Sequence, residues 1–238
     1  MFFFVKKSTI EMDAFTHWEH VYKYSPIIEA RQKVPDWFTS MEGKYMILDD
    51  LVPQATIKMC PAIQDYVLRG VIMPLWSDLA IAIEERIVRW QFADMLTENE
   101  SHPERQWAPF RSPYDYAHMK LRSPWILSCK EEVLFSWEKP FFHNDLPKEI
   151  EIVSGIDEYK YQNSSNVNFF VDVRQDNKLT IPQGTPLVRL LPLSDKKVRI
   201  KNHLVDEAEW KKKALKNQPV KFINQYRKMA KKCPFHSE

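Results

Sequence analysis

The stretch Ser154-Gly155-Ile156-Asp157-Glu158-Tyr159, followed by Asn168-Phe169-Phe170-Val171 and Ile181-Pro182-Gln183-Gly184-Thr185-Pro186-Leu187-Val188, decides the fold class. Each part contains a short run of β-branched or aromatic residues, bounded by Gly, Pro, Asn or Asp. Such runs are typical of β-strands joined by turns. The chain has only four glycines against 16 prolines. We therefore expect Gly155 and Gly184 at positions where the backbone must turn.

Further short apolar runs on both sides of this stretch predict additional strands. They are Val71–Trp76, Leu79–Ile83, Ile87–Phe92, Trp125–Cys129, Val133–Trp137, Glu149–Ile156, Val167–Val173, Leu187–Leu193 and Lys197–Ile200, with a turn at Glu84-Glu85. Strands spaced by turn signals every ~8–12 residues indicate a sandwich or barrel. The predicted fold is α+β, with a mainly antiparallel β-sandwich or jelly-roll-like core, a short N-terminal helical region and a C-terminal basic helix.

One helix is well marked near the N-terminus. It begins after Cys60 with Pro61, which suits the first helical position, and Gly70 suits its C-terminal stop. Upstream of it, Lys33-Val34-Pro35-Asp36-Trp37-Phe38 predicts a turn that buries two aromatic rings. Phe2–Val5 predicts a first strand, since its apolar run is too short for a signal peptide and has no cleavage site.

The pattern along the chain predicts a single domain over residues 1–238. Residues 1–93 form a mixed α/β part, and residues 94–124 form a long connection or lid without clear periodicity. Residues 125–201 form the β core, and residues 202–238 form a basic helical tail.

Composition excludes several classes of protein. Of the 238 residues, 44% are hydrophobic and 13% aromatic, which is typical of a globular chain. The net charge of +2 favours no strongly charged partner. Cys60, Cys129 and Cys233 lie far apart, which favours reduced thiols over a disulfide framework. No apolar run reaches the roughly 20 residues of a membrane span, so we expect a protein that is neither secreted nor inserted in a membrane.

A possible metal site is the triplet His143-Asn144-Asp145 together with His203. Two histidines and one carboxylate are the facial ligands of non-haem Fe(II) oxygenases, and Fe(II) is the cofactor if His143, Asp145 and His203 converge. The alternative is that the triplet is a polar turn that ends at Pro147. His203 also follows the last predicted strand.

The remaining histidines and Cys60 favour structural roles. His17 and His20 have helical spacing but no HExxH order and no third ligand nearby. His102 and His118 fall in the irregular connection, where they are solvated or part of a lid. Cys60 precedes a predicted helix, where a thiolate is stabilised, but a capping or buried role is the simpler interpretation.

The C-terminal tail is strongly basic. Nine Lys or Arg residues lie between Lys211 and Lys232 with no acid among them. Asp206, Glu207 and Glu209 precede them, an order that complements a helix dipole, and Pro219 is expected to split the helix. We expect an amphipathic helix that packs on its own domain. The alternatives are docking on a partner subunit and contact with nucleic-acid phosphates through Lys211, Lys212, Lys213 and Lys216.

The Gly155-Ile156-Asp157-Glu158-Tyr159 segment and the strand over Ile181–Leu193 resemble the strand motif of trimeric dUTPases. The resemblance implies that Asp157 is a catalytic carboxylate that positions a water molecule. It covers about 40 residues, and the phosphate motif and glycine-rich arm of that family have no counterpart in this chain. The alternative is that Asp157 accepts hydrogen bonds from turn amides at a strand end.

A broader resemblance covers roughly residues 34–200. Its landmarks are Val34–Trp37, Ala55–Pro61, Gly70, Ile72–Leu75, Asp78, Trp90, Lys120, Ser123–Trp125, Asp145–Pro147, Ser154–Asp157, Tyr159, Asn168-Phe169 and Ile181–Pro186. In these residues the chain resembles an uncharacterised protein family of large tailed phages of marine cyanobacteria. The family pattern has no HxD triplet, so the resemblance argues against His143 as a shared metal ligand.

Together these patterns favour a phage-encoded β-rich protein that binds or assembles, located in the host cytoplasm or the virion. Its expected partners are a second copy of itself, another phage protein or a host protein. The alternatives are an Fe(II) oxygenase-like enzyme with the HxD…H triad, and a nucleotide hydrolase with a dUTPase-like core.

Overall fold

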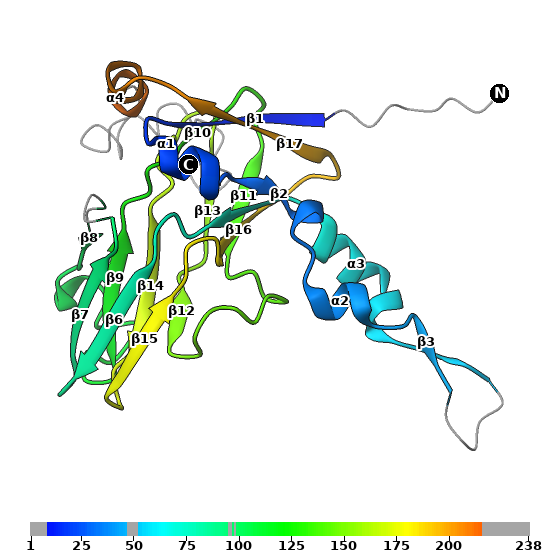
Figure 1. Ribbon diagram of the computed structural model, residues 1–238, viewed down its shortest axis with the longest axis horizontal. Coiled ribbons are helices and arrows are strands. Elements are labelled where there is room, and N and C mark those ends of the chain that lie inside the picture. Colours follow the sequence, from blue (N-terminus) through cyan, green and yellow to red (C-terminus); the bar gives the residue numbers. More distant parts are fainter. Residues whose placement is uncertain (1–8, 47–51, 95–96, 98, 216–238) are drawn as a thin grey trace, which may run out of the picture.

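The computed structural model describes residues 9–46, 52–94, 97 and 99–215, and Figure 1 shows their arrangement. The α+β fold with mainly antiparallel sheets is confirmed. The helices are α1 (Glu19–Tyr24), α2 (Asp36–Ser40), α3 (Pro61–Leu68) and α4 (Glu207–Leu215), and the 3-10 turns are η1 (Ala30–Gln32), η2 (Ile57–Met59) and η3 (Glu104–Gln106).

The described strands form five sheets. The largest has the order β13 (Gly155–Glu158), β11 (Leu134–Glu138), β16 (Pro186–Pro192), β5 (Val71–Pro74) and β2 (Ile28–Glu29), and we call it the five-stranded sheet. The four-stranded sheet has the order β12 (Ile150–Ile152), β14 (Val167–Asp172), β9 (Tyr116–Leu121) and β8 (Asn99–Glu100). One three-stranded sheet has the order β15 (Asn177–Ile181), β6 (Leu79–Glu84) and β7 (Ile87–Phe92). The other has the order β10 (Ile126–Cys129), β1 (Thr9–Thr16) and β17 (Lys197–Leu204). The last sheet is the pair β3 (Lys44–Tyr45) and β4 (Gln54–Ala55).

Strands β1 and β17 join the two ends of the described chain. They pair in parallel from Thr9 opposite Lys197 to Thr16 opposite Leu204. Burial in β1 alternates strictly between half-buried and buried positions, as expected of a strand with one face on the core. The strand predicted at Phe2–Val5 lies outside the described residues. The sequence interpretation missed β1, although its alternation of polar and apolar residues was visible.

One hydrophobic core connects the sheets other than the β3–β4 pair. Alternate side chains of β6 and β14 point into it, and Trp76 and Trp125 are among its largest fully buried residues. This inward alternation is the sandwich arrangement that short amphipathic strands produce. Because apolar burial is the main favourable term in folding, the core explains why many short strands give one compact body.

Three predicted boundaries were wrong. Segment 149–156 is not one strand, because β12 and β13 belong to different sheets. The connection at residues 94–124 contains β9, an inner strand of the four-stranded sheet. The turn between β6 and β7 is at Glu85-Arg86, where both residues have positive φ. Strand β15 was not among the predicted strands, although its burial alternates along the segment.

The helix predicted after Cys60 is confirmed as α3, with Pro61 in its first turn. It belongs to an arm, which we define as residues 36–46 and 52–68. The arm comprises α2, β3, β4, η2 and α3, and it projects away from the sheets (Figure 1). Trp37 and Phe38 are in helix α2 of this arm rather than in a turn, and only Phe38 is buried.

Gly70 lies at the turn between helix α3 of the arm and strand β5 of the five-stranded sheet. Its φ is +84°, in the left-handed region that glycine tolerates. A Cβ added here would lie 2.2 Å from the backbone oxygen of Leu190 in β16. Gly184 also has positive φ and occupies a turn, as predicted. Gly155 has neither a positive φ nor an atom within 4 Å of an added Cβ, so the expectation that it marks an obligatory turn was wrong.

Substitution of Gly70 by Ala is therefore expected to lower the free energy of unfolding by about 2–4 kcal/mol, through the strained φ and the clash with Leu190. Gly155→Ala is the matched control and should change stability by less than about 0.5 kcal/mol. Urea denaturation followed by tryptophan fluorescence measures both. Equal stability of the two variants would show that the Leu190 contact is unimportant.

Candidate functional site

Asp157 lies in β13, opposite Phe135 of β11. It is half-buried, and its neighbour Tyr159 is almost fully buried against the rings of Phe135 and Trp137. Burial raises the pKa of Asp157 from 3.8 to about 6. A carboxyl with this pKa could exchange a proton near neutral pH. Among the described residues, Asp157 makes no hydrogen bond or ion pair with a basic side chain, and burial is the cause of its raised pKa.

The three residues of the predicted metal triad do not converge. His143 is buried, and its Nδ1 lies 3.7 Å from Asp145 Oδ2. His203 is in β17 rather than beyond the last strand. Its Nε2 lies 2.7 Å from Asp13 Oδ1, and its ring stacks on Phe15. Within the described part of the chain, no three His, Cys, Asp or Glu side chains group in a way that could hold a metal ion.

A buried arginine connects the arm to the five-stranded sheet. Arg189 of β16 is 1% exposed, and its guanidinium lies 4.2 Å from the ring centroid of Tyr66 in α3. Its Nη2 donates a hydrogen bond to the backbone oxygen of Arg69, and its Nε lies 3.9 Å from Glu138 Oε1. A buried cation needs such partners because the loss of hydration is costly. The arm is therefore held on the sheet by a polar contact as well as by aromatic packing.

The aromatic part of this junction lies beside the 139–148 loop. Trp37 Nε1 donates a 2.8 Å hydrogen bond to the backbone oxygen of Phe142. The Phe142 ring also contacts Trp37 and Tyr66, with centroids 5.7 and 5.4 Å apart. Burial raises the pKa of Tyr66 to about 12, and contact with Glu138 adds to this rise. Two arm helices and the loop are thus connected through one phenylalanine.

An open cavity of about 530 Å³ lies at this junction, and we call it the junction cavity. It is lined by Trp37, Ile57, Lys139, Phe141, Phe142, His143, Asn144, Leu146 and Lys148. Burial lowers the pKa of His143, the cations Arg189 and Lys33 lower it further, and Asp145 opposes them. A neutral imidazole is therefore favoured there. Of the predicted site residues, only His143 lines this cavity, and the sequence interpretation missed the aromatic residues and lysines around it.

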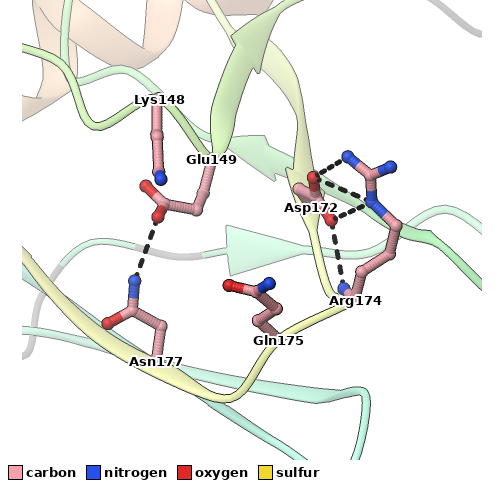
Figure 2. A pocket seen from close by; sticks show the side chains of 6 residues that line it. All are labelled: Lys148, Glu149, Asp172, Arg174, Gln175 and Asn177. Atoms are coloured by element: carbon pink, nitrogen blue, oxygen red, sulfur yellow. Dashed lines mark hydrogen bonds and ion pairs between the residues drawn. The ribbon is translucent and has the colours of Figure 1, made fainter.

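A second, polar cavity of about 510 Å³ lies between the start of β12, the end of β14 and the start of β15 (Figure 2). We call it the polar pocket. Arg174 donates hydrogen bonds to both carboxylate oxygens of Asp172, and the side-chain amide of Asn177 donates to Glu149 at 3.1 Å. Gln175 and Lys148 complete the lining. Lys148 also lines the junction cavity, so the two cavities are neighbours.

The basic tail is described as far as Leu215, where it forms α4 as predicted. Lys211 and Lys213 pair with Glu207 and Glu209 one turn away. Lys213 also lies over the Phe15 ring, and Trp210 Nε1 donates a hydrogen bond to Pro124. These contacts hold α4 on its own domain. Lys216 and Pro219 lie outside the described residues.

The other histidine pairs lie in packed surroundings. His17 accepts a 2.7 Å hydrogen bond from Trp18 and packs on Trp210, while His20 lies 3.8 Å from Asp94. The rings of His102 and His118 are 4.6 Å apart. Burial is the main cause that lowers the pKa of His118 to about 4. The neutral His118 ring therefore contributes to packing at neutral pH.

The described cysteines are free thiols, as predicted. Cys129 is buried, and burial raises its pKa to about 12, so it is a poor nucleophile at neutral pH. Cys60 is half-buried and precedes α3 without a side-chain cap hydrogen bond. Cys233 lies outside the described residues. No helix in the described ranges has the length and apolar character needed to cross a membrane.

Asp157→Asn is expected to become more stabilising as pH rises. The folded carboxyl keeps its proton up to about pH 6, whereas the unfolded chain loses it near 3.8. The wild-type chain therefore loses stability through this interval, and Asn does not titrate. Between pH 4 and pH 7.5, the free energy of unfolding of the variant should rise by about 1–3 kcal/mol relative to that of the wild type. Urea titrations at both pH values measure this, with exposed Asp195→Asn as the control. A difference that does not change with pH would contradict it.

Arg189→Leu is expected to destabilise the protein by about 2–4 kcal/mol, because Glu138 loses its cation and the arm loses its anchor. The double variant Arg189→Leu with Glu138→Leu should recover part of this loss, which a double-mutant cycle in urea measures. Arg199→Leu, at an exposed position of β17, is the control. A neutral effect of Arg189→Leu would mean that the arm is held by aromatic packing alone.

The chain was also compared with known proteins. No protein-family model, no curated protein and no solved structure matches it. The candidate site is an aromatic and basic cavity at the point where the projecting arm meets the five-stranded sheet.

Proposed function

We propose that this is a phage-encoded protein that acts by assembly, and that the arm is its contact element with a second copy of the chain. Its expected location is the host cytoplasm or the virion. The observation that carries the proposal is the apolar surface of the arm. Large apolar side chains there are exposed, including Tyr45 at 50%, Met46 at 60% and Val52 at 62%.

The arm has little core of its own. Its strands β3 and β4 contain two residues each, and among its described residues only Phe38 and Val67 are buried hydrophobic side chains. A short two-stranded hairpin is marginally stable in water unless it packs on something else. Burial of its apolar side chains against a partner supplies that packing.

A second copy is the partner that the arm's charges favour. The arm carries Asp36, Glu42, Lys44, Lys58 and Asp65, so both signs are present. A surface of mixed sign can pair with itself in a two-fold contact, in which each patch meets the same patch on the other subunit. A strongly charged partner would instead favour one sign.

The enzyme alternatives have less support. The oxygenase-like triad lacks convergence, since His203 pairs with Asp13. For a dUTPase-like hydrolase, the support is limited to Asp157 with its raised pKa. Asp157 lies beside buried aromatic rings and lines neither of the two cavities described above.

Analytical ultracentrifugation tests the proposal. The wild-type chain should be a dimer or larger. The double variant Tyr45→Lys with Val52→Lys should weaken self-association by about 100-fold or more while its circular dichroism stays unchanged, because buried lysines in an apolar contact are costly. Ile87→Lys, at a 56% exposed site on β7, is the control. A monomeric wild-type protein at the highest soluble concentration would exclude self-assembly.

A further inference from the structure

The junction cavity combines aromatic surface with positive charge. Trp37, Phe141 and Phe142 contribute rings, and Lys139 and Lys148 contribute ammonium groups. No carboxylate is present among its described lining residues. Its volume of about 530 Å³ is within the range of small-molecule sites, roughly 300–1,000 Å³. Such a lining suits a ligand that is both aromatic and anionic.

The aromatic surface is held in position before any ligand arrives. The Trp37 ring is held by its hydrogen bond to Phe142. Phe141 is 71% exposed and packs edge-on against Phe142, with centroids 5.2 Å apart. The exposed Phe141 ring is thus held in place by a second ring at nearly a right angle to it. A supported and exposed ring is a stacking surface for a planar base.

The two lysines are available to an anion. In the described part of the chain, neither Lys139 nor Lys148 makes an ion pair, whereas many surface lysines do, including Lys160 with Glu132 and Lys211 with Glu207. Lys148 also lines the polar pocket beside Glu149 (Figure 2), where its charge helps Arg174 to lower the pKa of Asp172. Lys148 is therefore the residue shared by the junction cavity and the polar pocket, whose lining also includes Glu149, Asp172, Gln175 and Asn177.

We infer that the junction cavity binds a nucleotide, with its base stacked on Phe141 and its phosphate held by Lys139 and Lys148. Stacked aromatic side chains beside a basic groove are the usual means of holding single-stranded nucleic acid. A free nucleotide offers the same base and phosphate. Because Lys148 lines both the junction cavity and the polar pocket, a chain of more than one nucleotide is favoured over the free nucleotide. The cavity shares Trp37 and Ile57 with the arm, but Tyr45 and Val52, the residues changed in the self-association test, do not line it.

Fluorescence anisotropy with a fluorescein-labelled oligothymidine of about 12 nucleotides tests the inference. Wild-type protein should bind saturably. Phe141→Ala should weaken binding about tenfold, because one stacking contact is lost. The double variant Lys139→Gln with Lys148→Gln should weaken binding and reduce the slope of log affinity against log salt by about 1.4, as expected for two lost phosphate contacts. Both variants change partly exposed side chains, and circular dichroism checks that they fold.

Two controls locate the site. Tyr114→Ala removes an equally exposed ring outside the cavity, and Lys212→Gln removes an exposed charge of α4. Neither should change affinity. Competition with thymidine monophosphate distinguishes a strand from a free nucleotide as the ligand. Equal affinity for thymidine monophosphate and for the oligothymidine would support a free nucleotide in the same cavity. Absence of saturable binding, or unchanged affinity of Phe141→Ala and the lysine variant, would overturn the inference. Loss of binding in Lys212→Gln alone would also overturn it.

The same assay on the Tyr45→Lys and Val52→Lys variant distinguishes the two proposals. Retained strand binding by a monomer would support the cavity and show that assembly is separate from it. If the monomeric variant no longer bound the oligothymidine, binding in the cavity would depend on the arm contact, and the two proposals would not be independent.

Discussion

Arg189 is a guanidinium buried in the middle of a sheet, and the position of the arm depends on it. Its contacts with Tyr66, the Arg69 carbonyl and Glu138 join α3 to β16. A cation without these partners would be costly in such a place. The partners are therefore required to stay together, and with them the arm, the 139–148 loop and the cavity between them.

The sheets and the arm have different structural roles in the molecule. The sheets other than β3–β4 are packed around one common core. The arm buries little of its own apolar surface and depends on contacts at its base, where Gly70 returns the chain toward Leu190. A projecting element with apolar side chains suits contact with another subunit. The cavity at its base keeps aromatic rings and lysines facing solvent, which suits a ligand.

Local sequence signals located most of the strands and the α3 helix, because their periodicity and turn residues are local properties. These signals failed for segments whose structure depends on pairing with a strand distant in the sequence. Strand β9 lies in a stretch rich in Pro and Ser, yet it is an inner strand because β14 pairs with it. The segment 149–156 reads as one strand but divides between two sheets. His203 belongs to β17, since β1 pairs with it in parallel and extends it.

The sequence by itself determined the fold class, the reduced cysteines that are described and the acid-to-base order of α4, because composition, periodicity and helix dipoles act over a few residues. Only the tertiary structure decided which side chains meet. It separated His203 from His143, placed Asp157 beside buried rings, and brought Trp37, Phe141 and Lys148 to one cavity across about 110 positions of chain. Contacts between distant residues depend on how sheets pair and pack, and no local pattern in a single sequence encodes that choice.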